Sequence, residues 1–400
     1  MTTPSRRSPA AAIAAVVALC LVATVMRPAI TAVGPLIPAM SADTGIPLAV
    51  LGALSTVILL IWTVVSPLTH GLGRRLGLGG AVLAALIVLA VGCVLRSIPG
   101  SSLWLWIGTG FIGVALAIGN VLLPAVIKRD FPTRVPLMMG VYSALLGASG
   151  AVGSGLAVPL SGVGGGSDWR LSLLLIGGGL VPIAIIAWGL VSRREMRAHR
   201  AGGTAAGGLA GIWRDPTAWA VAGYMGVQST VFYVLVTWLA AVSASTGRSA
   251  TVAGLDVSVF QLVSLIGALG IALLMRGRGA RLTPALTPVV GLIGIVGLIV
   301  APAAVGFWVI PLGLFSGSSL GISLTLMAER ARDHRAASAL SGMSQSVGYA
   351  IAAIGPLLFG VLHTATGGWT ASLLILVVTM LAQIVIGVFA ARDRYVLDPR

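Results

Sequence analysis

Charged residues are scarce in this chain of 400 residues. Only 9% of the residues are charged and 57% are hydrophobic, whereas about a quarter of the residues in an ordinary soluble protein are charged. So few charges cannot cover a water-facing surface, which excludes a soluble enzyme and a soluble nucleic-acid-binding protein. The apolar side chains must face lipid, so the composition predicts a polytopic membrane protein.

Acidic residues, lysine, histidine and cysteine are also rare. The 25 basic residues include one lysine and are balanced by only 10 acidic residues, which leaves a net charge of +15. In a membrane protein this excess indicates which loops face the cytoplasm rather than a nucleic-acid partner. The 4 histidines lie far apart and no Cys, His or Asp set has metal-ligand spacing, so we expect no metal and no other cofactor. The cysteines, Cys20 and Cys93, lie in apolar runs and imply no disulfide framework.

Long apolar runs separated by short polar breaks make up nearly the whole chain. Each run approaches the roughly 20 residues that a membrane helix needs, and none alternates as the strands of a membrane barrel do. The sequence therefore predicts an all-α polytopic membrane protein with twelve transmembrane helices. The predicted spans are 11–40, 47–69, 79–97, 103–127, 135–162, 170–192, 216–245, 250–275, 284–301, 303–328, 337–364 and 370–391.

The basic residues gather on one side of the predicted spans. Of the 25, 21 precede the first span or follow an even-numbered span, whereas only Arg96, Arg170 and Arg248 fall in the opposite loops. Loops rich in arginine and lysine face the cytoplasm. We therefore expect a multi-pass protein of the plasma (inner) membrane with both termini in the cytoplasm, which an even number of spans also requires.

A polar stretch rich in glycine and alanine divides the chain near its middle. Residues 193–214 are expected to form a cytoplasmic linker between six-helix bundles at 1–192 and 215–400. Gly52, Gly119 and Gly140 of the first half each have a glycine counterpart 202 residues further on in the second half. Two parallel six-span repeats are typical of major facilitator transporters, so we predict two pseudo-symmetric bundles. A chance alignment of the many glycines is the alternative explanation.

Several motifs together resemble one branch of that superfamily. Span 1 contains Met26-Arg27-Pro28 followed by a Gly-Pro pair, span 4 ends in Asn120-Val-Leu-Leu-Pro, and span 11 contains Gln345-Ser-Val-Gly-Tyr. Through these motifs the chain resembles the cyanate/nitroimidazole permease (CynX/NimT) branch over nearly its whole length. The resemblance implies a secondary active transporter that moves a small polar or planar solute by alternating access, either a cyanate-like anion or a nitroimidazole-like heterocycle.

Two positions depart from the family pattern. Val25 stands where the branch usually has an asparagine before its Leu-Arg-Pro run. The loop at 71–77 lacks the aspartate that the superfamily usually carries after span 2. The first departure leaves the solute open, and the second leaves open any gating contact in that loop.

Arg27 is the charged residue whose position most needs a functional explanation. It lies near the middle of span 1, about 20 Å from the cytoplasmic end, which is too far for the side chain to reach the interface. A charge at that depth costs at least ~2.5–3.5 kcal/mol unless it meets water or a partner. We expect the planar guanidinium to bind an anionic or electron-rich substrate. A structural arginine bonded to backbone carbonyls that Pro28 frees is the alternative.

Polar and aromatic residues inside other spans complete the predicted substrate site. Buried amides are costly in lipid and are expected to point into a central cavity, and aromatic rings can stack on a planar solute. Hydrogen bonding between helices and simple packing are the alternatives. Besides Arg27, the predicted substrate-binding residues are Asn120, Gln228, Tyr233, Trp238, Gln345 and Tyr349.

The sequence leaves the driving force open. Proton relays in membranes use Asp, Glu or His, and only Asp256 and His363 come near such a position. Protons are therefore a candidate partner beside the small solute and the bilayer, with Asp256 and His363 as the candidate coupling residues, and uniport and exchange are the alternatives. The expected state is a monomer without enzymatic activity.

Two other functions remain as alternatives. A multidrug or antibiotic efflux pump of the same superfamily should have a larger cavity rich in aromatic residues, but aromatics make up only 6% of this chain. A non-transporting membrane sensor should carry an added soluble domain, yet only about nine residues follow the last span.

Overall fold

The computed structural model describes residues 9–131, 134–163, 168–199, 210–275, 281–332 and 334–398, and their regular structure is helical. Short 3₁₀ helices include η1 (Ala210–Arg214) and η3 (Pro302–Ala304). The α-helices are α1 (Pro9–Val25), α2 (Pro28–Thr31), α3 (Val33–Thr44), α4 (Leu48–Arg96), α5 (Leu103–Asp130), α6 (Val135–Ser161), α7 (Trp169–Gly178), α8 (Val181–His199), α9 (Pro216–Ala244), α10 (Ala250–Leu274), α11 (Thr283–Val300), α12 (Val305–Glu329), α13 (His334–Thr366) and α14 (Thr370–Ala390).

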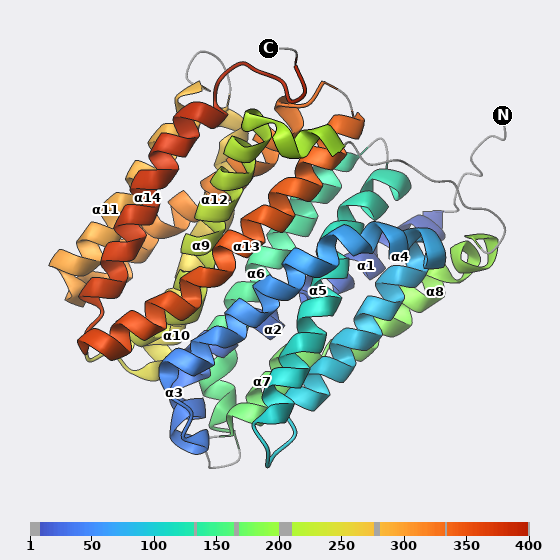
Figure 1. The fold of residues 1–400 in the computed structure, drawn as a ribbon. Coiled ribbons are helices and arrows are strands. Elements are labelled where there is room, and N and C mark those ends of the chain that lie inside the picture. Colours follow the sequence, from blue (N-terminus) through green and yellow to red (C-terminus); the bar gives the residue numbers. More distant parts are fainter. Residues whose placement is uncertain are drawn as a thin grey trace.

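Twelve helical segments of the described chain are long and apolar enough to cross a membrane. Eleven of them begin and end within a few residues of the predicted spans, which confirms the predicted fold class. Because the spans alternate in direction, α1 begins and α14 ends at the same end of the bundle, which we call the terminal face. The opposite end, where α3 ends and α7 begins, is the far face (Figure 1).

The first span differs most from its prediction. Where the sequence predicted one continuous helix over 11–40, the structure breaks at Arg27 into α1, α2 and α3. Pro28 is the first residue of α2, a position that suits proline because its ring presets φ and its missing N–H is not needed there. The break therefore sets Arg27 at the joint between two helices, near the middle of the bundle.

A second departure from a straight helix lies at the terminal face. The helix α4 contains both the second span, Leu48–Thr69, and the third, Arg75–Arg96. The chain turns at Gly77, two residues into the third span, where a φ of 74° and a ψ of 158° are non-helical. Glycine alone adopts such a positive φ without a steric cost, so this residue lets two antiparallel spans follow one another with almost no loop.

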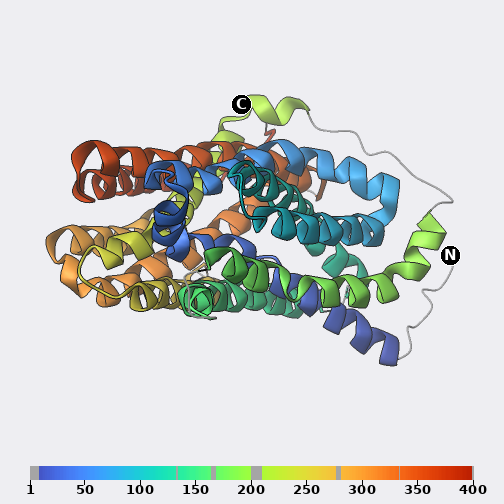
Figure 2. The same cartoon turned by 90° about the horizontal axis from the view of Figure 1, so that it is seen from below.

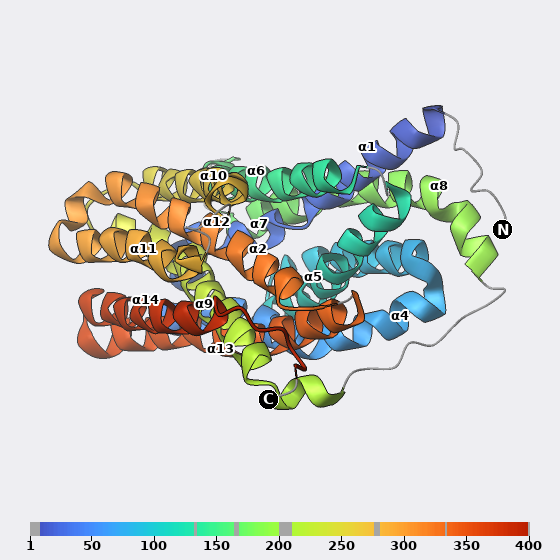
Figure 3. The ribbon, with the colours of Figure 1, turned by 90° about the horizontal axis from the view of Figure 1, so that it is seen from above.

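The first six spans and the last six lie side by side as two bundles (Figures 2 and 3). They meet mainly where α4 packs on α13 and where α6 packs on α10. Residues 200–209 of the predicted linker lie outside the described residues. The described parts of the predicted linker are the end of α8 and the short helix η1.

Candidate functional site

A cavity of about 670 Å³ lies between the two bundles. One wall comes from the segment around Arg27 and from α4, α5 and α6, and the other from α9, α10, α12 and α13. Its size is within the range of small-molecule sites in proteins, roughly 300–1,000 Å³. Both bundles therefore contribute to one site.

The cavity extends from the middle of the bundle towards the terminal face. The helix α9 starts at that face and lines the cavity from Met225 to Tyr233 but not beyond. The helix α5 ends at that face and lines the cavity only from Asn120 to Pro124. The far-face half of α9 is packed against the first bundle instead, whereas the far-face half of α5 packs on α4 of its own bundle.

Direct contacts between the bundles seal the far-face side of the cavity. The hydroxyl groups of Ser55 and Thr237 share a hydrogen bond of 2.7 Å, and Thr56 donates one of 2.7 Å to the carbonyl oxygen of Ala353. At Gly34 an added Cβ would lie 2.4 Å from the carbonyl oxygen of Val236. Backbones from opposite bundles are thus in contact, and the described lining of the cavity does not extend past them to the far face.

A polar junction closes the inner end of the cavity. Gln261 of α10 donates hydrogen bonds to the carbonyl oxygen of Gly150, at 3.0 Å, and to the hydroxyl of Ser154, at 2.8 Å. Thr31 of α2 donates to the same Gly150 oxygen at 2.9 Å. One carbonyl of α6 therefore ties the segment after Arg27 to the opposite bundle.

Arg27 faces the cavity from the break in the first span. Its Nη1 donates a hydrogen bond of 3.4 Å to the hydroxyl of Tyr233, and its guanidinium lies 5.1 Å from the centre of the Phe232 ring. Both partners belong to α9 of the other bundle. Arg27 is the one charged residue among the described residues that line the cavity. Most of its donors remain free for a solute, since a guanidinium carries five N–H groups.

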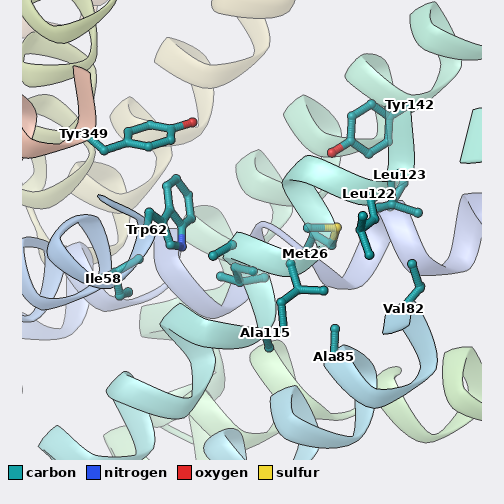
Figure 4. Packing of buried hydrophobic residues seen from close by; sticks show 14 of the residues in the cluster. Met26, Ile58, Trp62, Val82, Ala85, Ala115, Leu122, Leu123, Tyr142 and Tyr349 are labelled. Carbon is teal, nitrogen blue, oxygen red and sulfur yellow. The ribbon is translucent and has the colours of Figure 1, made fainter. Parts of the chain in front are cut away.

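Aromatic rings surround the position of Arg27. The indole of Trp62 meets the ring of Tyr233 edge-on at 5.8 Å and that of Tyr349 at 4.9 Å, and its Nε1 donates to the Gly113 carbonyl oxygen at 3.0 Å. Figure 4 shows Trp62 below Tyr349, with the hydroxyl groups of Tyr349 and Tyr142 directed into the space between them. A flat solute at Arg27 would meet ring faces as well as hydroxyl donors.

The amides that the sequence predicted to face a cavity do line it. Asn120, Gln228 and Gln345 are all on its walls. Gln228 donates to the hydroxyl of Ser229 at 2.8 Å, and Gln345 donates to that of Ser341 at 3.1 Å. With Arg27, Tyr233 and Tyr349, six of the seven predicted substrate-binding residues are gathered around one space.

Trp238 is the exception among the predicted site residues. Its side chain is 1% exposed, and its Nε1 donates to the carbonyl oxygen of Pro356 at 2.8 Å. An added Cβ at Gly52 would lie 2.1 Å from the indole. The structure therefore places Trp238 in the packing between the bundles on the far-face side, away from the cavity.

The two residues considered for proton coupling also lie away from the cavity. Asp256 accepts hydrogen bonds from Arg248 at 2.9 Å and from Ser243 at 2.5 Å. His363 is stacked on Trp369, with ring centres 3.6 Å apart. Neither is among the described residues that line the cavity, and no three His, Cys, Asp or Glu side chains of the described chain gather as metal ligands would.

Sequence reasoning missed several residues of the site. Tyr142 and Phe232, which line the cavity, and Trp62, which packs on two of its rings, were assigned no role, because an aromatic residue inside an apolar span does not by itself show that it faces a cavity. Arg96 was placed in an outer loop, but it is the last residue of α4 and only 1% exposed. That prediction was wrong, because a guanidinium at the end of a helix can turn inward when a backbone carbonyl is within reach.

Comparison with known proteins places this architecture in a family. A family model described as Major Facilitator Superfamily matches residues 19–353. The 2-nitroimidazole transporter of Escherichia coli (strain K12) is 36% identical over 94% of this chain and 95% of its own length. The cyanate transport protein CynX of the same organism is 28% identical over 88% of this chain and 90% of its own.

The fold also matches a solved structure. A bacterial homologue of the human lysosomal transporter Spinster, in an inward-facing and unoccupied conformation, aligns with a TM-score of 0.79. The alignment covers 98% of this chain and 100% of that one at 15% sequence identity. Identity this low makes the likeness one of fold alone.

Proposed function

The chain belongs to the major facilitator superfamily of transporters, and from its cavity we infer that it carries a small planar solute, either anionic or electron-rich. The observation that supports this most directly is Arg27, a single positive charge set among aromatic rings where the two bundles meet. A guanidinium offers a flat fork of donors that suits carboxylate-like, nitro or cyanate groups.

The rest of the wall suits the same class of solute. Tyr142, Tyr233 and Tyr349 present hydroxyl groups, and Asn120 and Gln345 present amides that can donate to or accept from a heteroatom. A nitroimidazole ring is flat and carries electron-rich oxygens, and cyanate is a small anion. The names of the two relatives therefore agree with the chemistry of the wall.

We propose that the solute moves by alternating access. The bundles would rock about the contacts near Arg27, which would open the far face as the terminal face closes. The predicted bundles at 1–192 and 215–400 would move as units joined by the linker at 193–214. The bias of 21 basic residues towards the terminal face supports a cytoplasmic location for that face, and the cavity would then be open inward.

Export of larger planar drugs is a second candidate. A space of about 670 Å³ is much larger than cyanate requires and falls within the range of drug-sized sites. The two candidates differ in how much they depend on Arg27. Binding of a small anion needs the guanidinium, whereas binding of an uncharged drug rests on the aromatic and apolar walls.

The test is solute binding by the purified protein and two arginine variants. We expect saturable binding of cyanate and of 2-nitroimidazole. Arg27→Gln should raise the Kd by at least about tenfold, which is ~1.4 kcal/mol of binding free energy. Arg281→Gln, an exposed arginine on the terminal face, should leave the Kd unchanged. An unchanged Kd in a folded Arg27→Gln protein would contradict the proposal, and tight, Arg27-independent binding of larger drugs would favour the second candidate.

A further inference from the structure

We propose that this protein is an exchanger, whose cavity changes faces rapidly only when a negatively charged or electron-rich solute occupies Arg27. Entry of one solute molecule would then be tied to the exit of another. The proposal rests on the function proposed above and goes beyond it, because it specifies how transport is coupled.

The argument begins with the charge balance of the cavity. The described walls carry one formal charge, the guanidinium of Arg27. Asp256 is the one described acidic residue that lies more than a helical turn inside a membrane span, and it is already paired with Arg248. The other described acidic residues lie at helix ends or in connecting segments. No described carboxylate is therefore placed to neutralise Arg27 when the bundles close.

The present conformation avoids this problem because the guanidinium lies on the wall of the open cavity. Arg27 is partly exposed, and its polar contact with Tyr233 is long, at 3.4 Å. A transporter must pass through a state in which the cavity is closed to both faces. Water is then excluded, and the described partners near the charge are neutral: the Phe232 ring and the hydroxyl groups of tyrosines such as Tyr233.

A buried charge without a counter-charge is among the least favourable arrangements in a protein. The closed state of the empty carrier should therefore be high in free energy, which slows the change of face. A bound anion supplies the missing charge, and an electron-rich group supplies part of it. Closure around an occupied Arg27 should be faster by at least about tenfold, because rates depend exponentially on the free energy of such a barrier.

A proton cannot replace the solute in this role. Arginine stays protonated at every physiological pH, so it has no charge to gain. The described walls contain no Asp, Glu or His that could take up a proton and change the balance. His363 lies outside the cavity, stacked on Trp369, and Asp256 faces Arg248 and Ser243. A pH gradient should therefore not drive the empty carrier across.

Exchange is tested in proteoliposomes that contain the full chain. Initial uptake of labelled cyanate is measured into vesicles loaded with unlabelled cyanate and into empty vesicles, and 2-nitroimidazole serves as the second probe. We expect uptake at least about tenfold faster into loaded vesicles, and no comparable gain from a pH gradient across empty ones. Equal rates into loaded and empty vesicles would overturn the exchange mechanism while leaving the transport function intact. No binding or uptake of either probe would overturn both.

A second measurement follows the conformational change itself. The two native cysteines are first replaced (Cys20→Ala, Cys93→Ala), so that dyes attach only at Ser102→Cys and Ser249→Cys. These two positions are exposed near the far face in opposite bundles. Single-molecule energy transfer between the dyes then reports opening of the far face. With Arg27 present, cyanate should speed switching by at least about tenfold. Arg27→Gln should switch fast with or without cyanate, and Arg281→Gln should behave like the parent. Fast switching of the empty parent protein would overturn the proposal.

Discussion

The guanidinium of Arg96 donates a hydrogen bond of 2.7 Å to the carbonyl oxygen of Ala29, two residues after Arg27. Ala29 belongs to α2, the short helix that follows the break in the first span. Arg96 is almost fully buried, and its Nε and Nη2 have no hydrogen-bond partner among the described residues. The end of the third span therefore holds the segment that positions Arg27.

We expect Arg96→Ala to weaken cyanate binding by about tenfold, because α2 loses the donor that fixes its orientation. If Arg96 acts through Arg27, the same substitution should have no further effect in an Arg27→Ala background. Arg96→Lys, which keeps a charged donor, should recover part of the affinity. Equilibrium binding of the four proteins in this cycle checks the coupling. Equal losses in both backgrounds would show that Arg96 has only a structural role.

Gly34 should be needed for closure of the far face. Its missing side chain lets the backbone of the first bundle approach Val236, and a methyl group there would lie 2.4 Å from a carbonyl oxygen. Such overpacking typically costs about 1–3 kcal/mol, which corresponds to a shift of roughly 5–150-fold in a two-state equilibrium. Gly34→Ala should therefore lengthen the Ser102–Ser249 dye distance. Gly270→Ala, which meets no atom within 4 Å, serves as the control.

Trp62 should support both the fold and the binding of planar solutes. Its side chain is 1% exposed and contacts the rings of Tyr233 and Tyr349. Trp62→Ala leaves a cavity, for which losses of about 3–5 kcal/mol are typical, and should lower both the thermal unfolding temperature and the affinity for 2-nitroimidazole. Trp62→Phe should restore most of each. Trp213→Ala, at an exposed tryptophan, should change neither, and a Trp62→Ala protein of unchanged affinity would contradict the role in binding.

Acid should weaken a contact at the far face. Asp43 accepts hydrogen bonds from Arg170 at 2.6 Å and from the indole of Trp169 at 3.0 Å, and these hold the pKa of the Asp43 carboxyl below its usual range, the Arg170 bond most strongly. Because this pKa is lower in the folded chain, the pair stabilises the protein above the unfolded pKa of about 3.9 and loses its effect as the pH falls through the folded value.

Asp43→Asn should therefore lower the unfolding temperature at pH 7 but not at a pH below both pKa values. The Asp43 side chain is 49% exposed, so the loss should be no more than ~1 kcal/mol. Thermal unfolding of both proteins at the two pH values measures this. A difference that persists or grows in acid would contradict the assignment.

The membrane spans were predictable because apolar length is a local property of the chain. The polarity of Arg27, Asn120, Gln228 and Gln345 also predicted that they face inward, since each would be costly in lipid. The aromatic residues carried no such information. Trp62 and Trp238 both lie inside apolar spans, yet one supports the cavity and the other packs the far-face contact. Where a helix is buried on most sides, its sequence has no separate polar face, so the pattern does not distinguish a residue next to the cavity from one in the packed contact between the bundles.

By itself, the sequence determined the number of spans, their alternation, the excess of basic residues on one side and the presence of an arginine in the middle of the first span. These follow from the free energy of moving each segment between water and lipid, which depends on composition and length. Only the tertiary structure decided which residues meet that arginine. The break at Pro28, the hydrogen bond from Arg96 and the rings of Phe232 and Tyr233 come from distant segments, and their meeting depends on how the two bundles pack.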